Sequence, residues 1–343
     1  MDVRELSVEG WLKVVHVRDD AAGLNAIISV HNAALGPAVG GCRIFPYASF
    51  EAALDDVKRL SRGMTYKNAL AGIPFGGGKS VIIADPKKDK TPQMFRAFGE
   101  ALNTLDGLYY TAEDSGITER DLEIVRSVTK YVGGIESRGL GGNPSPFTAR
   151  GVWRGIEAAV RYKMVRDSLD GIRVSILGVG AVGMALAEHL HEAGAVLTVA
   201  DVNPDAVAEA KRRFGARVVA PDDAVAADVD VYSPCALGGA INAKTVARLK
   251  AKIVAGAANN QLATPEMGEI LRDKGVLYAP DYVINAAGVI SVGLEILGKW
   301  SKQGLNDRID AIGPRLERIF ERAEEAGLAT SAVADDMAME VIG

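Results

Sequence analysis

The sequence predicts an α/β protein of two domains, in which a mixed α+β domain precedes a domain built on a parallel sheet. The chain has 343 residues, 48% of them hydrophobic, which is enough for about two packed cores. Apolar and polar residues alternate over residues 12–30, as in a β-hairpin. From about residue 170, short apolar strands alternate with helical runs, a pattern typical of parallel βαβ units.

In the first half, the predicted elements are one hairpin and three helices. The hairpin strands cover residues 12–17 and 24–30, separated by a polar turn that contains glycine. Apolar residues then recur at helical spacing after Ser49, Thr91 and Thr118, and each of these residues can cap a helix N-terminus. The first half is therefore predicted to be an α+β domain.

In the second half, predicted strands alternate with helices. The strands are residues 173–177, 196–200, 217–219, 229–232, 252–255 and 276–278, and the helices are residues 181–192, 204–214 and 243–249. After about residue 285 the strands stop, and an apolar stripe from Ile309 to Ala323 predicts a helical segment despite Gly313-Pro314. We therefore expect domains over residues 1–140 and 141–307, with C-terminal helices over 308–343 that pack back across both.

Composition and charge exclude several classes of function. The 39 Lys and Arg against 44 Asp and Glu leave a net charge of −5, so the chain has no overall attraction to nucleic acid or to anionic membranes. Cys42 and Cys235 stand far apart and the four histidines supply no ligand set, so we expect neither disulfides nor a metal. The N-terminus lacks the features of a signal peptide. We expect a cytoplasmic protein that acts on a small molecule.

A glycine motif predicts a dinucleotide site. The segment Gly178-Val179-Gly180-Ala181-Val182-Gly183 follows a predicted strand and opens a predicted helix, where free N–H groups can face a pyrophosphate. Asp201, at the end of the next strand, can accept hydrogen bonds from both ribose hydroxyls and would repel a 2′-phosphate. We therefore predict a Rossmann domain that binds NAD through Gly178, Gly180, Val182, Gly183 and Asp201. The alternative is a glycine-rich turn without a ligand.

Two lysines and one acidic pair are the candidate catalytic groups. Lys67 lies in Met64-Thr65-Tyr66-Lys67-Asn68-Ala69, and Lys79 follows three glycines just before an apolar strand. If both ammonium groups share one cleft, each disfavours the charge of the other, so one can act as a general base while the other holds a carboxylate. The alternative is two exposed lysines beside a flexible glycine loop. Glu113-Asp114 alone could equally be turn residues.

Seven motifs, taken together, resemble one known family. They are Gly40–Arg43, Met64–Ala69, Gly76–Lys79, Thr111–Asp114, Gly142–Pro146, Ala257–Gln261 and Ala279–Ala286. In this order, over nearly the whole chain, they resemble the leucine/phenylalanine/valine branch of the amino acid dehydrogenase superfamily that also contains glutamate dehydrogenase. Within it, the leucine dehydrogenases are the most similar. The resemblance implies NAD-dependent oxidative deamination of an L-amino acid to its 2-oxo acid and ammonia, without a metal, in a homo-oligomer.

The resemblance also implies roles for individual residues in a cleft between the substrate domain and the Rossmann domain. Lys67 would bind the substrate carboxylate, Lys79 would activate water, and Asp114 would carry the proton to and from nitrogen. Gly41 would lie against the substrate. The residues implied on the cofactor side are Pro146, Thr148, Asn259 and Asn260. Those implied in the side-chain pocket are Val39, Ala112, Val289 and Val292, which suit a branched-chain substrate.

Some residues depart from the leucine dehydrogenase pattern and leave alternatives open. The departures are Ser115, Gly116, Ile117, Asn259 and Ala287. Asn259 resembles phenylalanine dehydrogenases, so an aromatic substrate is the first alternative. Glutamate is disfavoured because Val39 and Val292 would leave its side-chain carboxylate unpaired. A catalytically silent NAD-binding sensor is a further alternative, although Lys67, Lys79 and Asp114 are all present.

Overall fold

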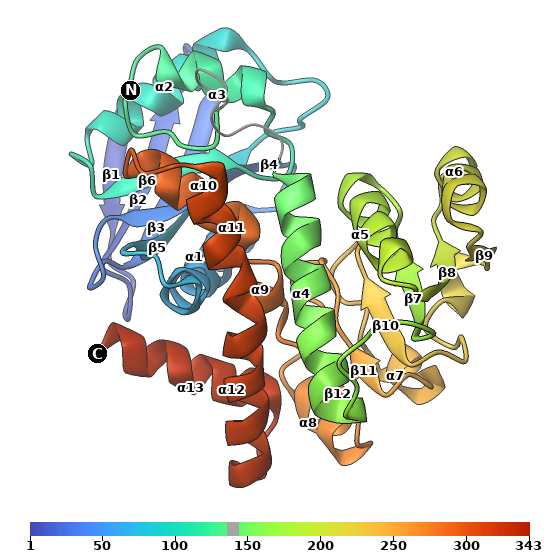
Figure 1. The fold of residues 1–343 in the computed structure, drawn as a ribbon. Helices are drawn as coiled ribbons and strands as arrows, with labels where there is room; N and C mark the ends of the chain where they lie inside the picture. The colour runs from blue at the N-terminus through green and yellow to red at the C-terminus, as the bar shows by residue number, and fades with distance from the viewer. Residues whose placement is uncertain (136–143) are drawn as a thin grey trace. The chain divides into compact units, whose positions relative to one another are not determined.

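The computed structural model describes residues 1–135 and 144–343 (Figure 1). Contacts divide the chain into two units. The first unit comprises Met1–Gly142, Val289–Ser301 and Ala338–Gly343, and the second comprises Asn143–Gly288 and Lys302–Met337.

The first unit is built on a six-stranded sheet. In chain order its strands are β1 (Asp2–Leu6), β2 (Lys13–Asp19), β3 (Leu24–Asn32), β4 (Ala38–Phe45), β5 (Gly76–Ile83) and β6 (Tyr109–Glu113). Their order in the sheet is β1-β2-β3-β5-β4-β6, antiparallel from β1 to β5 and parallel among β5, β4 and β6. The predicted hairpin is the β2–β3 pair.

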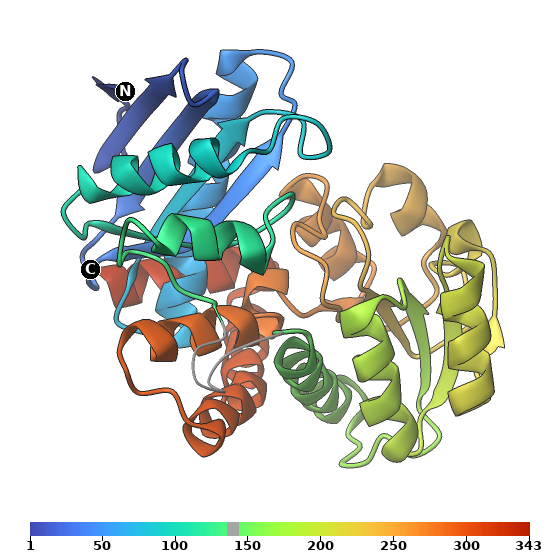
Figure 2. The same cartoon turned by 90° about the horizontal axis from the view of Figure 1, so that it is seen from above.

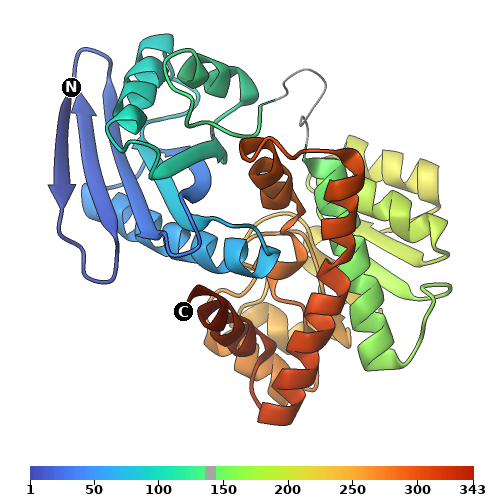
Figure 3. The same cartoon turned by 60° about the vertical axis from the view of Figure 1, so that its left-hand side comes forward.

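Helices cover both faces of this sheet (Figure 3). Helix α1 (Phe50–Ala71) packs on β3 and β5, where Ala53 and Val57 join a cluster with strand residues. On the opposite face lie α2 (Pro92–Asn103) and α3 (Glu119–Arg126), and Figure 2 shows α2 running across the strands. This second cluster is the larger core of the unit.

The predicted helix starts are confirmed by their caps. The Ser49 side chain accepts a hydrogen bond from the N–H of Ala52, and Thr91 accepts one from Met94. At α3, Thr118 and Asp121 cap each other's backbone N–H groups. These bonds satisfy donors that the first helical turn leaves without partners.

The second unit contains a parallel sheet of six strands. They are β7 (Arg173–Leu177), β8 (Val196–Ala200), β9 (Arg217–Val218), β10 (Val231–Pro234), β11 (Ile253–Val254) and β12 (Leu277–Tyr278). The order is β12-β11-β10-β7-β8-β9, so the winding reverses beside β7. In sheets of this kind the ligand binds at the carboxyl ends of the strands at such a reversal.

Helix α4 (Ser145–Met164) precedes the sheet of the second unit. The segments that connect its strands contain α5 (Ala181–Glu192), α6 (Pro204–Phe214), the 3₁₀ turn η1 (Pro221–Asp223), α7 (Ala243–Arg248) and α8 (Glu266–Asp273). The alternation confirms the predicted βαβ organisation.

The chain closes with short helices, and here one prediction needs correction. They are α9 (Asp281–Ile284), α10 (Ala287–Ile296), α11 (Lys302–Asp310), α12 (Ile312–Ala326) and α13 (Thr330–Ile342). The single apolar stripe predicted from Ile309 onwards is divided between α11 and α12 at Ala311. Pro314 lies in the first turn of α12, where its missing N–H breaks no helical hydrogen bond. Helix α12 packs along α4.

Candidate active site

The register of the first sheet places the predicted substrate and catalytic residues on one face. Val39 of β4 is paired with Gly77 of β5 and with Tyr110 of β6, all in parallel. Side chains two residues apart share a face. The same face therefore carries Val39, Gly41 and Arg43 from β4, Lys79 from β5, Ala112 from β6, and Asp114 directly after β6. Helix α1, which carries Lys67, covers this face.

Lys79 and Asp114 form an ion pair in which the Lys79 Nζ lies 2.6 Å from Asp114 Oδ2. The Lys79 side chain is 8% exposed and that of Asp114 is 19% exposed. The sequence predicted that Lys79 stands just before a strand, but the glycine triplet and Lys79 itself lie within β5. Glycine allows this burial because α1 approaches so closely that a Cβ on Gly77 would overlap the backbone of Thr65. The alternative of an exposed Lys79 is therefore wrong.

Asp114 has a second cationic neighbour that the sequence reasoning missed. Arg43 Nε lies 3.3 Å from Asp114 Oδ2, and Arg43 Nη1 donates to Asp56 Oδ2 at 3.0 Å. Burial raises the pKa of Asp114, but the positive charges of Lys79 and Arg43 help to outweigh this effect, so the pKa lies below its usual value. Asp114 is therefore held ionised.

Gly41 permits the approach of the strand that delivers Asp114. A Cβ at Gly41 would lie 2.6 Å from the Glu113 carbonyl oxygen and 2.8 Å from Asp114 Cβ. Any side chain there would push β4 and the end of β6 apart, so Gly41 positions Asp114.

Lys67 lies on the part of α1 that is fastened to β4 and β5. The neighbouring Asn68 amide donates to the carbonyl oxygens of Val39 at 3.2 Å and of Gly76 at 2.6 Å. Lys67 itself is half-buried near the end of the helix. The contacts of Asn68 thus fasten the helical segment that carries Lys67 to the strands that carry Val39 and Lys79.

Two of the predicted apolar pocket residues of the first unit, Ala112 and Val292, lie beside the same glycine. Val39 and Ala112 are buried on adjacent strands, and Val292 lies on α10. A Cβ at Gly134 would lie 3.4 Å from Val292 Cγ2 and 3.8 Å from Ala112 Cβ, so these two side chains border the same glycine. Val289, one turn before Val292, is half-buried.

In the second unit, the glycine motif forms the turn between β7 and α5. Gly178 has φ +98°, and a Cβ at Gly183 would lie 1.9 Å from the Gly178 carbonyl oxygen, so both positions require glycine. A Cβ at Gly180 would meet nothing within 4 Å. Asp201 accepts hydrogen bonds from the backbone N–H of Val179 at 2.7 Å and of Asn203 at 2.8 Å. The carboxylate thus stands directly beside the turn.

The remaining predicted cofactor residues lie elsewhere in the second unit. Asn259 Oδ1 accepts a hydrogen bond from Asn285 Nδ2 at 2.9 Å, and Asn260 has φ +52°. Thr148 is in the first turn of α4, which Pro146 helps to open, and Val182 is in the first turn of α5. Gly142 and Asn143 of the fifth motif lie outside the described residues.

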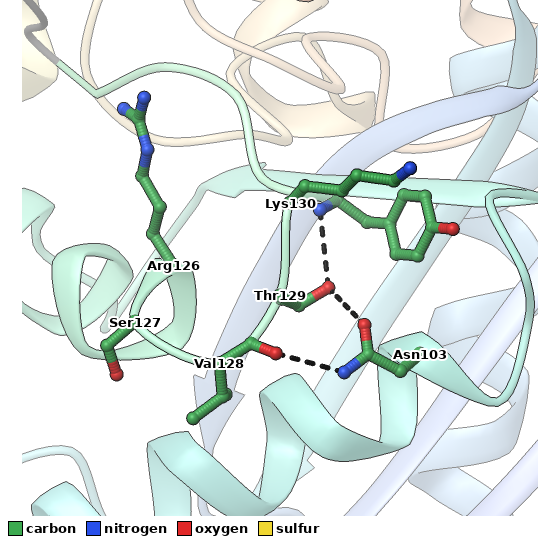
Figure 4. Close-up of a pocket in the computed structure, with 7 residues that line it drawn as sticks. Asn103, Arg126, Ser127, Val128, Thr129 and Lys130 are labelled. Carbon is green, nitrogen blue, oxygen red and sulfur yellow. Dashed lines mark hydrogen bonds between the residues drawn. The ribbon is translucent and has the colours of Figure 1, made fainter.

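The first unit also has a surface pocket with a different set of lining residues. It has a volume of about 460 Å³ and is lined by Asn103 and residues 126–131 (Figure 4). Its polar atoms largely bond to one another, as in the hydrogen bond from Thr129 Oγ1 to Asn103 Oδ1 at 2.7 Å. It contains no predicted site residue.

The described part of the chain holds neither a cluster of metal-ligating side chains nor a helix of membrane-spanning character. Over 1–135 and 144–343, no three His, Cys, Asp or Glu side chains are grouped as a metal ion would need. Within the same ranges, no helix is long and apolar enough to cross a membrane.

Comparison with known proteins agrees with this arrangement. Residues 10–131 match the family model "Glu/Leu/Phe/Val dehydrogenase, dimerisation domain", and residues 141–340 match "Glutamate/Leucine/Phenylalanine/Valine dehydrogenase". Leucine dehydrogenase of Bacillus subtilis is 48% identical over 331 residues, covering 96% of this chain and 91% of that one. Phenylalanine dehydrogenase of Caldalkalibacillus thermarum is 42% identical over 334 residues, covering 96% and 90%.

A solved structure shows the same fold over nearly the whole chain. The crystal structure of L-tryptophan dehydrogenase from Nostoc punctiforme matches with a TM-score of 0.85 at 43% identity, covering 97% of this chain and 96% of that one. The resemblance and the fold class predicted from the sequence are confirmed. With its ion-paired lysine and dinucleotide-type turn, the chain belongs to the glutamate/leucine/phenylalanine/valine dehydrogenase family and is an amino acid dehydrogenase.

Proposed function

We propose that the chain catalyses the reversible, NAD-dependent oxidative deamination of an apolar L-amino acid, with branched-chain substrates preferred, to the 2-oxo acid and ammonia. The observation that carries the proposal is the buried Lys79–Asp114 pair on the same sheet face as the apolar Val39 and Ala112. The pair supplies acid–base groups, and the apolar residues supply a wall for a hydrocarbon side chain.

Each charged residue has a separate task. Lys67 pairs with the substrate carboxylate, which fixes the orientation of the amino acid. Asp114, held ionised, takes a proton from the substrate ammonium group and returns one in the reverse reaction. Lys79 removes a proton from the water that attacks the iminium carbon. Gly41 leaves room for the substrate backbone beside these groups.

The turn at Gly178 has the features that a dinucleotide needs. The family is one of NAD(P)-dependent dehydrogenases. The open space at Gly180 and the N-terminus of α5 fit a pyrophosphate held by Gly178, Gly180, Val182 and Gly183. A nicotinamide cofactor held there would supply the hydride acceptor for the reaction. Pro146, Thr148, Asn259 and Asn260 would position the nicotinamide end.

NAD is favoured over NADP by Asp201. Its carboxylate stands beside the turn, where it can bind both ribose hydroxyls and repels a 2′-phosphate. None of the four residues after Asp201 is Arg or Lys.

The choice of substrate rests on the pocket residues. Val39, Ala112, Val289 and Val292 offer no polar partner, so a glutamate side chain would be left unpaired. The relatives named for phenylalanine and tryptophan make an aromatic substrate the second candidate.

We also infer a homo-oligomer in the cytoplasm. The dimerisation-domain match over residues 10–131 supports self-association. Cys42 and Cys235 are free thiols, which is in keeping with a reducing compartment.

A substrate screen tests the proposal. NAD⁺ reduction is followed at alkaline pH with leucine, valine, isoleucine, phenylalanine, tryptophan and glutamate, with NADP⁺ in parallel. We expect the highest kcat/KM with branched-chain substrates and NAD⁺. Several of them should react at graded rates, because one methylene is worth only about 1–3 kcal/mol. A clear aromatic preference would overturn the substrate, and no turnover with any amino acid would favour the NAD-binding sensor.

A further inference from the structure

We propose that Arg43, anchored by Asp56, is a positioning residue that keeps the Asp114 carboxylate oriented, and ionised at the point where it accepts a proton from the substrate. The inference rests on the proposed function, in which Asp114 exchanges a proton with the substrate nitrogen.

The guanidinium group of Arg43 is clamped between two carboxylates from different elements. Arg43 Nε lies 3.3 Å from Asp114 Oδ2, and Nη1 lies 3.0 Å from Asp56 Oδ2. The three side chains are 18–21% exposed. Arg43 belongs to β4, Asp56 to α1, and Asp114 follows β6, so the contact links three elements at the site.

Asp56 is itself held in place. It accepts a hydrogen bond from Tyr47 Oη at 2.6 Å and one from Arg59 Nη2 at 2.7 Å. Because both Asp56 oxygens are engaged, the carboxylate that anchors Arg43 cannot readily rotate away. Asp56 therefore holds Arg43 through a different nitrogen from the one that contacts Asp114.

Arg43 keeps a constant positive charge beside Asp114, which Lys79 does not. Lys79 contacts the same Oδ2 atom, but in the proposed mechanism it must also exchange a proton with water. A lysine ammonium is a single charge on a flexible stem, whereas a guanidinium is planar and stays protonated in proteins. Arg43 therefore keeps one positive charge on Asp114 when the charge of Lys79 changes.

Other titratable groups surround Asp114. They are Lys79 on β5, Arg43 and Cys42 on β4, and Tyr109 and Glu113 on β6. Burial raises the pKa of Cys42 to about 12 and that of Tyr109 further, so both stay neutral in the working range. Partial desolvation and the negative charges of Glu119, Asp114 and Asp121 raise the pKa of Glu113 at the end of β6. Arg43 and Lys79 are thus the cations that hold Asp114 ionised.

The pH profile of kcat/KM separates this role from a merely structural ion pair. In Arg43→Gln, Asp114 loses one positive neighbour, so its pKa should rise. The acid limb, which is the fall of kcat/KM at low pH, should therefore shift to a pH about one unit higher. Below the limb, turnover should fall by roughly tenfold at fixed pH. In Arg43→Lys the charge is kept, so the limb should stay near its original position. Its kcat should still fall, because lysine cannot bridge both carboxylates.

A variant of the anchor and a control variant complete the test. Asp56→Asn should lower kcat without raising the acid limb, because Arg43 loses its anchor but not its charge. Arg18→Gln is the control and should match the wild type, because Arg18 is an exposed residue of β2 whose ion pair is with Asp20. Circular dichroism and NADH binding check that each variant is folded.

Several outcomes would overturn the proposal. If Arg43→Gln loses turnover equally at every pH, Arg43 is structural only. If Arg43→Gln does not fold, an acid limb that rises in Arg43→Lys or in Asp56→Asn overturns the proposal instead. A wild type without amino acid turnover would overturn the proposed function and this inference together. If the wild type turns over amino acids normally but the acid limb of kcat/KM in Arg43→Gln stays at the wild-type pH, this inference alone is overturned.

Discussion

Glu295 of α10 accepts a hydrogen bond from the backbone N–H of Gly134 at 2.9 Å, and the N–H of Ile135 lies 3.4 Å from its other carboxylate oxygen. The contact fastens α10 to the segment that follows Tyr131. Val292, one turn earlier on α10, consequently rests on Gly133 and Gly134 beside Ala112. The position of the proposed pocket wall therefore depends on a bond between residues 161 positions apart.

Replacing Gly133 by alanine should narrow the proposed side-chain pocket. A Cβ there would lie 2.9 Å from Val292 Cγ1 and 3.0 Å from two carbons of Ile296, so the side chain of Val292, a proposed pocket residue, must move. For Gly133→Ala we expect kcat/KM for leucine to fall by about tenfold and that for valine to fall less, since valine is shorter. Gly63→Ala is the matched control, because a Cβ at Gly63 meets nothing within 4 Å. Equal losses for both substrates would contradict the pocket assignment.

Neutralising Glu295 should not destabilise the protein. Burial raises the pKa of Glu295 and outweighs the hydrogen bonds from Gly134 and Ile135 that lower it. When folding raises the pKa of an acidic group, the folded protein loses stability as the pH rises from the pKa of that group in the unfolded chain to its pKa in the folded chain. Glu295→Gln keeps an acceptor without the charge, so its Tm at pH 8 should equal or exceed that of the wild type. Glu295→Ala leaves the N–H groups unpaired and should cost about 1–3 kcal/mol. A Gln variant as unstable as the Ala variant would refute this.

Removing Lys79 should abolish most turnover. A general base contributes about 10²-fold or more, so Lys79→Ala should lower kcat by at least that factor while leaving NADH binding largely intact. Lys87→Ala, an exposed lysine beyond the end of β5, is the matched control. A near-normal kcat in Lys79→Ala would show that the base lies elsewhere.

Removing Lys67 should weaken substrate binding more than chemistry. Its proposed partner is the substrate carboxylate, and charge-assisted contacts of this kind are strong. We expect KM for the amino acid to rise strongly in Lys67→Ala, measured over a full substrate titration. An unchanged KM would exclude the contact.

Replacing Asp201 should alter the choice of cofactor. Asp201→Ala removes both a ribose hydrogen-bond acceptor and a charge that repels the 2′-phosphate, so KM for NAD⁺ should rise and that for NADP⁺ should fall. Asp205→Ala, an exposed acid in the first turn of α6, is the control. If the NAD⁺ to NADP⁺ ratio of kcat/KM does not change, the carboxylate does not face the ribose.

Local signals were sufficient for much of the fold. The turn at Gly178–Gly183, the hairpin of β2 and β3 and the caps at Ser49, Thr91 and Thr118 are set by nearby residues, because each depends on backbone conformation or on a contact within a few positions. The sequence motifs also identified the family. They did not predict β1, β4, β6 or the long helix α4 as elements.

The tertiary structure decided the rest, because it depends on contacts that sequence spacing does not encode. The Gly76–Gly78 run has little intrinsic preference for a strand and becomes one because β3, β4 and α1 pack against it. Arg43 was visible in a motif, but its role emerged only when folding brought β4, α1 and the end of β6 to one point. The sequence determined which charged groups are available, and the register of the sheet determined which of them meet, because a shift of one residue would turn Lys79 and Asp114 to the opposite face.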